Sequence, residues 1–357
     1  MCICLRMPDN SLEVRMSKIL FIGDLNEYGR GFLRYRTLKE MGHEVVAHTH
    51  TKVSGFNHIE PPSFLYRVFW KLRIPLDDTR VSRKIINSLS AGTFDIVWIE
   101  KGNMIKPWTL EKIKSLALGA KQISCSEDDM YAPHGHSLWY RLGLKYYDTV
   151  FTTKTYNLSE LQLFGAQRTV LFLDSYDENV HKPMQLSAEE LARFSCEVSV
   201  IGAFEPERAE SLLFLAENGV QVTIWGNGWG HWVNCHKNLV VKNEFLFGPD
   251  YARAISASKI NLNFLRKVNR DQVTSRSVEI PACGGFMLGE RTERHLEFFE
   301  EGQEAEFFDS NEELLEKTRY FLEHPDERIK IAQAGRDRCL NGGYSMREQL
   351  KEITKAA

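Results

Sequence analysis

The feature that most constrains the fold is a regular alternation of short apolar runs with longer amphipathic stretches, and it occurs in two blocks. Apolar runs without polar alternation are typical of strands buried on both faces, and therefore of a parallel sheet covered by helices. The first block of predicted strands lies at 18–23, 43–49, 94–100, 121–126, 149–154 and 168–174, and the second at 196–202, 220–226, 238–243, 259–265, 285–290 and 305–309.

The two blocks are separated by a polar stretch that contains Pro183 and no apolar strand, which is typical of a connection between domains. A chain of 357 residues also suits two domains better than one core. We therefore predict two tandem Rossmann-like, doubly wound α/β domains. The predicted segments are a disordered leader at 1–15, a first domain at 16–176, a linker at 177–195, a second domain at 196–342 and a C-terminal helix at 343–357.

Charge and cysteine content exclude several classes of protein. The net charge of -3 balances 45 basic against 48 acidic residues, so no bulk field favours nucleic acid as a partner. No apolar run approaches the roughly 18 residues that span a bilayer, and the N-terminus lacks the apolar region of a signal peptide. Seven scattered cysteines without a CxxC pair fit reduced thiols, so we expect a cytoplasmic protein.

The segment DQVTSRSVEIPACGGFMLGE, residues 271–290, carries the strongest functional signal. It is read as a loop with Asp271, a helix over 275–283 that contains Glu279, a Gly-Gly break and a buried strand. The unpaired N–H groups and the dipole at such a helix start attract phosphate, and the hydroxyls of Thr274 and Ser275 would add donors.

This segment resembles the donor-site motif of nucleotide-sugar glycosyltransferases of the GT-B architecture, in which a Glu-x7-Glu pair precedes an Ala-Cys-Gly turn. The chain departs from that motif by carrying Asp at the first position. The likeness is closest to glycosyltransferase-like proteins of the spore-maturation CgeB type, and it implies two domains with a cleft between them and a terminal helix that crosses back. It extends to the segments at 23–45, 126–135, 146–161 and 199–215.

The resemblance implies that the second domain binds a UDP- or GDP-sugar. Glu279 matches the carboxylate that accepts hydrogen bonds from the ribose hydroxyls, and Asp271 matches the first acid, near the transferred sugar. Arg208 stands where related enzymes place a basic residue on the diphosphate. The other predicted donor-binding residues are Gly202, Gly226, Thr274, Ser275 and Arg276, with Arg266 as a secondary candidate.

Two further features of the donor and cleft loops have two readings each. Trp225, Trp229 and Trp232 either stack on the base or pack their own Gly-rich loop. The loop that contains Gly29, Arg30 and Gly31 either contacts phosphate or acceptor, or is a plain turn between strand and helix.

A cluster of titratable residues follows the strand at 121–126, at an edge that would face the cleft. An inverting enzyme would use one of its acids as base, whereas a retaining enzyme needs no strong base; we expect retention. His134 and His136 lack a third ligand at useful spacing, so no metal or other cofactor is expected. The cluster comprises Glu127, Asp128, Asp129, His134 and His136, and the predicted catalytic residues are Asp128, Asp129, His134 and Asp271.

The sequence therefore predicts a hexosyltransferase-like enzyme that moves a sugar from a nucleotide diphosphate sugar to a glycan, lipid or protein acceptor. A lipid acceptor would bring the protein to the membrane periphery. Two alternatives stay open: a nucleotide-sugar epimerase of the same fold, and a non-catalytic nucleotide-sugar or glycan-binding protein of a surface assembly.

Overall fold

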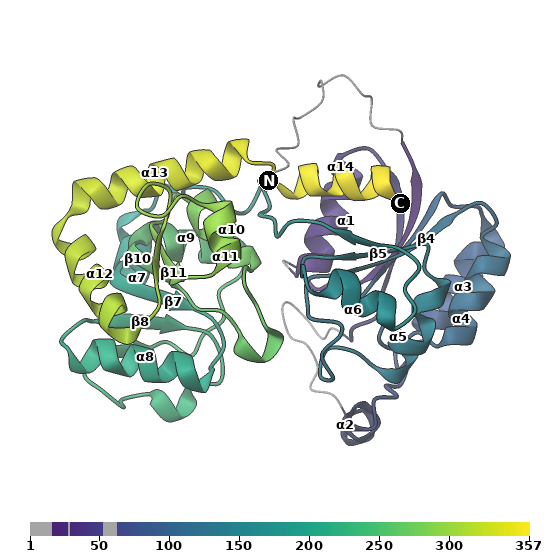
Figure 1. Cartoon of the computed structure of the whole chain (residues 1–357), viewed down its shortest axis with the longest axis horizontal. Helices are drawn as coiled ribbons and strands as arrows, with labels where there is room; N and C mark the ends of the chain where they lie inside the picture. Colours follow the sequence, from purple (N-terminus) through teal and green to yellow (C-terminus); the bar gives the residue numbers. More distant parts are fainter. Residues whose placement is uncertain (1–15, 28, 53–62) are drawn as a thin grey trace.

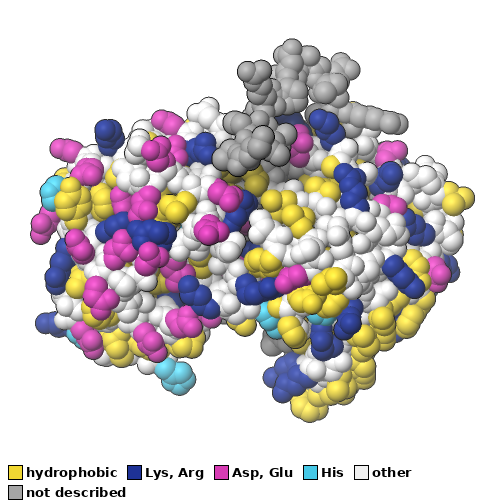
Figure 2. Space-filling model, viewed as in Figure 1, with side chains coloured by type: hydrophobic (Ala, Val, Ile, Leu, Met, Phe, Trp, Pro, Cys, Tyr) yellow, Lys and Arg dark blue, Asp and Glu magenta, His cyan; other side chains and the backbone are white. Residues whose placement is uncertain are grey.

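The computed structural model describes residues 16–27, 29–52 and 63–357, and shows two α/β lobes side by side (Figure 1). Each lobe is built on one six-stranded, fully parallel sheet. The surface is notched between the lobes at its lower edge (Figure 2). The predicted leader at 1–15 lies outside the described residues.

The first sheet has the strand order β2-β1-β3-β4-β5-β6, and all six predicted strands of the first block are present. The order reverses between β1 and β3, and this reversal opens a crevice at the carboxyl ends of the two strands. The strands are β1 Lys18–Gly23, β2 Glu44–Thr49, β3 Ile96–Glu100, β4 Lys121–Ser126, β5 Thr149–Thr152 and β6 Thr169–Leu171; the helices are α1 Arg30–Glu40, α2 Phe64–Lys71, α3 Val81–Ala91, α4 Pro107–Leu116, α5 Leu138–Gly143 and α6 Asn157–Leu163.

The second sheet has the order β12-β11-β10-β7-β8-β9, and the six predicted strands of the second block are also present. Its order reverses between β7 and β10, which opens a second crevice. The strands are β7 Cys196–Ile201, β8 Val222–Trp225, β9 Leu239–Val241, β10 Ser258–Asn263, β11 Met287–Glu290 and β12 Glu306–Phe308; the helices are α7 Ala188–Phe194, α8 Pro206–Glu217, α9 Gly248–Ala257, α10 Ser275–Ala282, α11 Glu293–Phe298, α12 Asn311–Glu323, α13 Pro325–Asn341 and α14 Met346–Ala356.

Burial on both faces of the sheets explains the continuous apolar runs. In β1, Leu20 and Ile22 pack with residues of α3 and α4 on one face, whereas Ile19 and Phe21 pack on the opposite face. Because neither face meets water, both must be apolar. None of the described helices is both long and apolar enough to cross a bilayer.

The C-terminal helix crosses back to the first lobe, as expected. After α13 runs along the second lobe, α14 packs Met346, Leu350 and Ile353 into the core that contains Ile19 and Phe21 of β1 (Figure 1).

The two chain crossings between the lobes run side by side. Tyr176 donates its N–H to the carbonyl of Tyr344 (3.1 Å), and Met346 donates to the carbonyl of Tyr176 (2.8 Å). The second half of the predicted linker forms α7, which starts at a capping box on Ser187 and buries Phe194 in the second lobe.

Candidate active site

The loops that follow the strand ends of the two sheets meet between the lobes. Ion pairs join the two lobes here: Arg30 Nη1 lies 3.4 Å from Glu279 Oε1, and Lys154 Nζ lies 2.6 Å from Asp271 Oδ1. Arg270 pairs both with Asp129 (Nε to Oδ2, 2.6 Å) and with Glu160 (Nη2 to Oε2, 2.8 Å). Both topological reversals therefore open onto one interlobe site.

Glu127, which follows β4, is the centre of the first-lobe side of this site. Its carboxylate accepts hydrogen bonds from Arg30 (Nη2 to Oε1, 2.7 Å) and from Arg34, and Arg34 also pairs with the buried Glu100 at 2.6 Å. The hydroxyl of Ser275, at the start of α10, donates to Glu127 across the interface at 3.4 Å. Burial disfavours the charge on Glu127, but the two guanidinium groups outweigh it and hold the pKa at about 2.

Glu279 projects from α10 into the same site. It is 8% exposed, accepts a hydrogen bond from the Tyr251 hydroxyl at 2.9 Å, and lies 3.7 Å from His181 Nε2. These contacts hold the carboxylate at the interlobe surface. Its predicted role, binding the ribose hydroxyls, stays a prediction.

Asp271 is paired rather than free. Both members of the pair with Lys154 are almost completely buried, and Asn269 donates a further hydrogen bond to Asp271 at 2.9 Å. Burial raises the pKa of Asp271 and raises that of the nearby Asp174 to about 7, while the Lys154 ammonium opposes both shifts. A second buried charge network thus adjoins the one around Glu127.

Arg208, in the first turn of α8, is a buried cation without a carboxylate partner among the described residues. It is 4% exposed, donates to the carbonyl of Ala203, and has no partner at Nε. A Cβ added to Gly202 would lie 2.7 Å from Arg208 Nη1 and 3.7 Å from Arg276 Nη2, so both guanidinium groups converge on this strand-end glycine. Burial and the charge of Arg276 lower the pKa of Arg208 to about 10.

Gly226 and Trp229, which follow β8, pack against the backbone of Gly202. Gly226 has φ +138°, and a Cβ there would lie 2.1 Å from the carbonyl oxygen of Gly202, so only glycine fits. Trp229 is fully buried, donates to the same oxygen at 2.9 Å and packs against Trp232, while Trp225 lies in the core. Core packing therefore accounts for Trp225, and packing within the loop accounts for Trp229; base stacking by Trp232 stays a prediction.

The start of α10 is fixed by a hydrogen-bonded chain. Thr274 donates its N–H to Ser277 Oγ (3.2 Å), which lies 2.7 Å from His295 Nε2. His295 Nδ1 faces the carbonyl of Glu290 at 2.6 Å, so Nδ1 carries the proton and Nε2 accepts from Ser277. The buried hydroxyl oxygen of Thr274 has no partner among the described atoms.

The cleft loop after β1 orients Arg30. Gly29 is the N-cap of α1, and a Cβ at Gly31 would lie 2.4 Å from the carbonyl oxygen of Asp24. The loop therefore packs directly on the first turn of α1, and Arg30 reaches Glu127 and Glu279.

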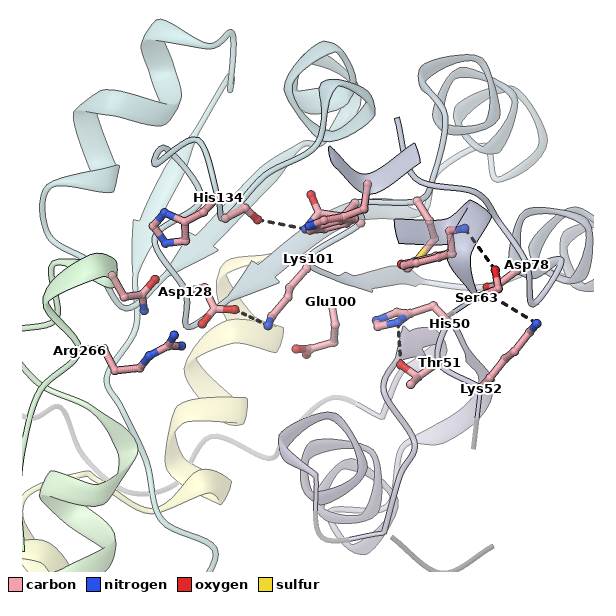
Figure 3. A pocket seen from close by; sticks show the side chains of 17 residues that line it. His50, Thr51, Lys52, Ser63, Asp78, Glu100, Lys101, Asp128, His134 and Arg266 are labelled. Atoms are coloured by element: carbon pink, nitrogen blue, oxygen red, sulfur yellow. Dashed lines mark hydrogen bonds and ion pairs between the residues drawn. The ribbon is translucent and has the colours of Figure 1, made fainter. Parts of the chain in front are cut away.

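A cavity of about 530 Å³ lies beside the charge networks, mainly on the first lobe (Figure 3). Asp128, which is paired with Lys101, and the exposed His134 line it, and Arg266 and Asn269 contribute from the second lobe. Tyr66 and Trp70 of α2 also line it. The walls therefore combine charged groups with aromatic side chains, which suits a polar ligand such as an oligosaccharide-sized molecule.

Asp129 and His136 lie outside this cavity, and the structure favours structural roles for both. Asp129 is fully buried and its oxygens accept from the Tyr131 and Ala132 N–H groups (3.1 Å each), from Asn157 (2.9 Å) and from Arg270. A carboxylate that is fully buried and held by four hydrogen bonds caps its loop and is not open to an acceptor.

His136 is buried, and Arg73 contacts its Nε2 while its Nδ1 faces the carbonyl of Ala132. Burial and the Arg73 charge lower its pKa to about 4. Within the described ranges, no three His, Cys, Asp or Glu side chains are grouped as a metal site.

Several site residues were not singled out from the sequence: Arg34, Glu100, Lys154, Asp174, His181 and Tyr251. Two carried a usable signal. Arg34 lies four residues after Arg30, on the same helix face, and Lys154 follows the carboxyl end of β5 at the cleft edge.

Comparison with known proteins agrees with this architecture. Residues 208–355 match the protein family described as Glycosyl transferase-like. No curated protein matches the sequence.

Solved structures show the same two-lobed GT-B fold. Anabaena HepE, crystallised with UDP and glucose, superposes with a TM-score of 0.64 at 12% identity, over 95% of this chain and 99% of that one. Sucrose-phosphate synthase from Thermosynechococcus elongatus gives 0.65 at 10% identity, over 95% and 98%. A glycosyltransferase from Rickettsia africae gives 0.60 at 14% identity, over 96% and 98%. At these identities the likeness is one of fold.

Proposed function

We propose that the protein is a glycosyltransferase that binds a nucleotide diphosphate sugar, with UDP as the nucleotide, on its second lobe. The observation that carries this proposal is Arg208, a buried guanidinium without a carboxylate partner among the described residues, which converges with Arg276 on Gly202. A buried cation is costly unless an anion accompanies it, and a diphosphate is the anion that the fold relatives suggest. The Glycosyl transferase-like match covers both arginines.

These arginines also supply the chemistry that the reaction requires. Cleavage of the bond between sugar and diphosphate leaves negative charge on the phosphate, and fixed guanidinium groups in a buried site stabilise that charge without a metal ion. The N–H groups at the start of α10 add to this stabilisation, since the Ser277–His295 chain holds the helix start in place. We therefore propose metal-independent transfer.

The acids of the site support retention of configuration. Glu127 is a poor base because two arginines hold its pKa at about 2, and Asp129 is fully buried and paired with Arg270. Asp128 is paired with Lys101, which leaves His134 as the exposed predicted candidate on the cavity wall. In a retaining reaction the leaving phosphate takes the acceptor proton, and none of these groups has to act as a base. The anomeric configuration of the product, read by proton NMR, tests this.

The cavity of about 530 Å³ is the proposed acceptor site, and it favours transfer over epimerisation. An epimerase acts on the donor alone and needs no cavity for an acceptor. A transferase releases UDP in proportion to glycosylated acceptor, whereas an epimerase yields a changed sugar in the absence of any acceptor.

Nucleotide binding is the direct test. Thermal unfolding is followed with UDP, GDP, CDP and dTDP, each without added metal. We expect UDP to stabilise the protein by about 2.7 kcal/mol at a hundredfold excess over its Kd. If none of the four nucleotides shifts the transition, the second lobe is not a nucleotide site and the proposal is wrong.

A further inference from the structure

Helix α2 stands apart from the rest of the first lobe and carries apolar side chains in solvent. None of its residues is buried, and Phe64 and Leu65 are 71% and 61% exposed; Leu72, which ends the helix, is 63% exposed. In Figure 1 the helix projects from the lower end of the lobe, away from the sheet. Exposed apolar side chains gathered on one short element mark a contact surface.

The most exposed apolar side chains of this element, Phe64, Leu65 and Leu72, share one face. Phe64, Val68 and Leu72 follow at intervals of four residues, and Leu65 lies beside this row. The opposite face points inward, because Tyr66 and Trp70 line the proposed acceptor cavity, their rings stacked with centroids 6.4 Å apart. The helix therefore separates the cavity from an outer apolar stripe.

Basic residues border that stripe. Helix α2 contains Arg67 and Lys71 and no acidic residue. At 3.6 residues per turn, Arg67 and Lys71 lie along one edge of the stripe. Neither Arg67 nor Lys71 forms an ion pair with a described carboxylate. Figure 2 shows hydrophobic and basic side chains together at this end of the lobe.

We propose that α2 lies on an anionic membrane surface, with Phe64, Leu65 and Leu72 in the interface and Arg67 and Lys71 among the headgroups. An apolar stripe bordered by cations fits the boundary between acyl chains and negative headgroups. The cavity behind Tyr66 and Trp70 then opens beside the membrane, so the acceptor is carried by a lipid. This last step rests on the proposed function, whereas membrane binding does not.

Sedimentation with vesicles tests the surface. The whole protein is mixed with vesicles of phosphatidylcholine, with or without 30 mol% phosphatidylglycerol, without donor or acceptor. We expect binding only to the anionic vesicles, with a loss in raised salt. Phe64→Ala/Leu65→Ala should lower the partition coefficient at least about tenfold. Arg67→Gln/Lys71→Gln should lower it about fivefold for each charge removed.

Leu118→Ala is the matched control, because Leu118 is 87% exposed but lies in the turn between α4 and β4 and is not part of α2. It should bind vesicles as the parent does. Equal vesicle binding by the parent and the Phe64→Ala/Leu65→Ala variant, or no binding by the parent, would overturn the proposal. So would an α2-dependent dimer in size-exclusion chromatography, which would identify the stripe as a contact between two copies. Unchanged UDP titration of the α2 variants separates these outcomes from a failure of the proposed function.

Discussion

Replacing Arg208 by Met should make the protein more stable and bind UDP more weakly. The Arg208 side chain is 4% exposed, and one hydrogen bond, to the carbonyl of Ala203, is all that offsets the burial of its charge among the described residues. Met keeps an unbranched apolar stem in the same space while it removes both the charge and the crowding against Arg276.

The lowered pKa of Arg208 shows that its charge destabilises the folded protein. The drop in the pKa of Arg208 from 12.5 to about 10 corresponds to about 3 kcal/mol of destabilisation of the charged side chain. At neutral pH the arginine is charged in both the folded and the unfolded state, so this full cost lowers the free energy of unfolding. Loss of the hydrogen bond to Ala203 costs about 1 to 1.5 kcal/mol. The variant should therefore gain about 1 to 2 kcal/mol, or several degrees in Tm for a lobe of this size.

UDP affinity should fall, because Arg208→Met removes the cation that would pair with the diphosphate. Removal of one partner of a buried charge pair costs about 2 to 4 kcal/mol of binding free energy, or roughly 30- to 1,000-fold in Kd. Thermal unfolding and calorimetric titration with UDP measure the two effects on one sample.

Arg253→Met is the control, because Arg253 pairs with Glu190 at 2.7 Å and with Asp250 at 2.8 Å in the same lobe. It should lose stability and keep its UDP affinity. The reasoning fails if Arg208→Met is destabilised like the control and binds UDP like the parent.

Three further outcomes are expected. Glu279→Gln should weaken UDP binding in calorimetry while the unfolding transition stays near that of the parent, because the amide still accepts from Tyr251; unchanged affinity would remove Glu279 from the donor site. Asp129→Asn should cost about 2 kcal/mol at pH 7 in urea unfolding. Burial opposes the charge of Asp129, but hydrogen bonds from Arg270, Asn157 and the backbone lower the pKa of this carboxyl. The stabilisation by the charged carboxylate is therefore present above about pH 4 and is lost as the pH falls through the folded pKa. The difference in unfolding free energy between parent and variant should accordingly disappear in acid. Turnover should survive EDTA, and a complete loss that manganese or magnesium restores would refute the metal-independent proposal.

The strands were predictable because both faces of each sheet are buried. Twelve apolar runs suffice to locate twelve strands, and the start of α10 followed from Thr274 and Ser275 before an apolar helix. These features depend on local sequence, which a single chain contains in full.

The ion pairs of the site were not predictable, because they join residues remote in the sequence. Arg30 and Glu279 are 249 positions apart, and Asp129 and Arg270 are 141 apart. The sequence placed Asp128 and Asp129 side by side without indicating which one faces the cavity. Only the packing of the lobes shows that Asp128 lines the cavity wall while Asp129 is enclosed by its own loop.

The crossing of α14 also bears on how the chain folds during synthesis. Met346, Leu350 and Ile353 complete the core around Ile19 and Phe21, so the first lobe waits for a helix that is made after the whole second lobe. At about 5–20 residues per second the ribosome needs roughly 10–40 seconds to add the second lobe. Throughout that interval the nascent first lobe exposes the apolar face that α14 later covers, and the emergence of α14 from the ribosome is the step that closes it.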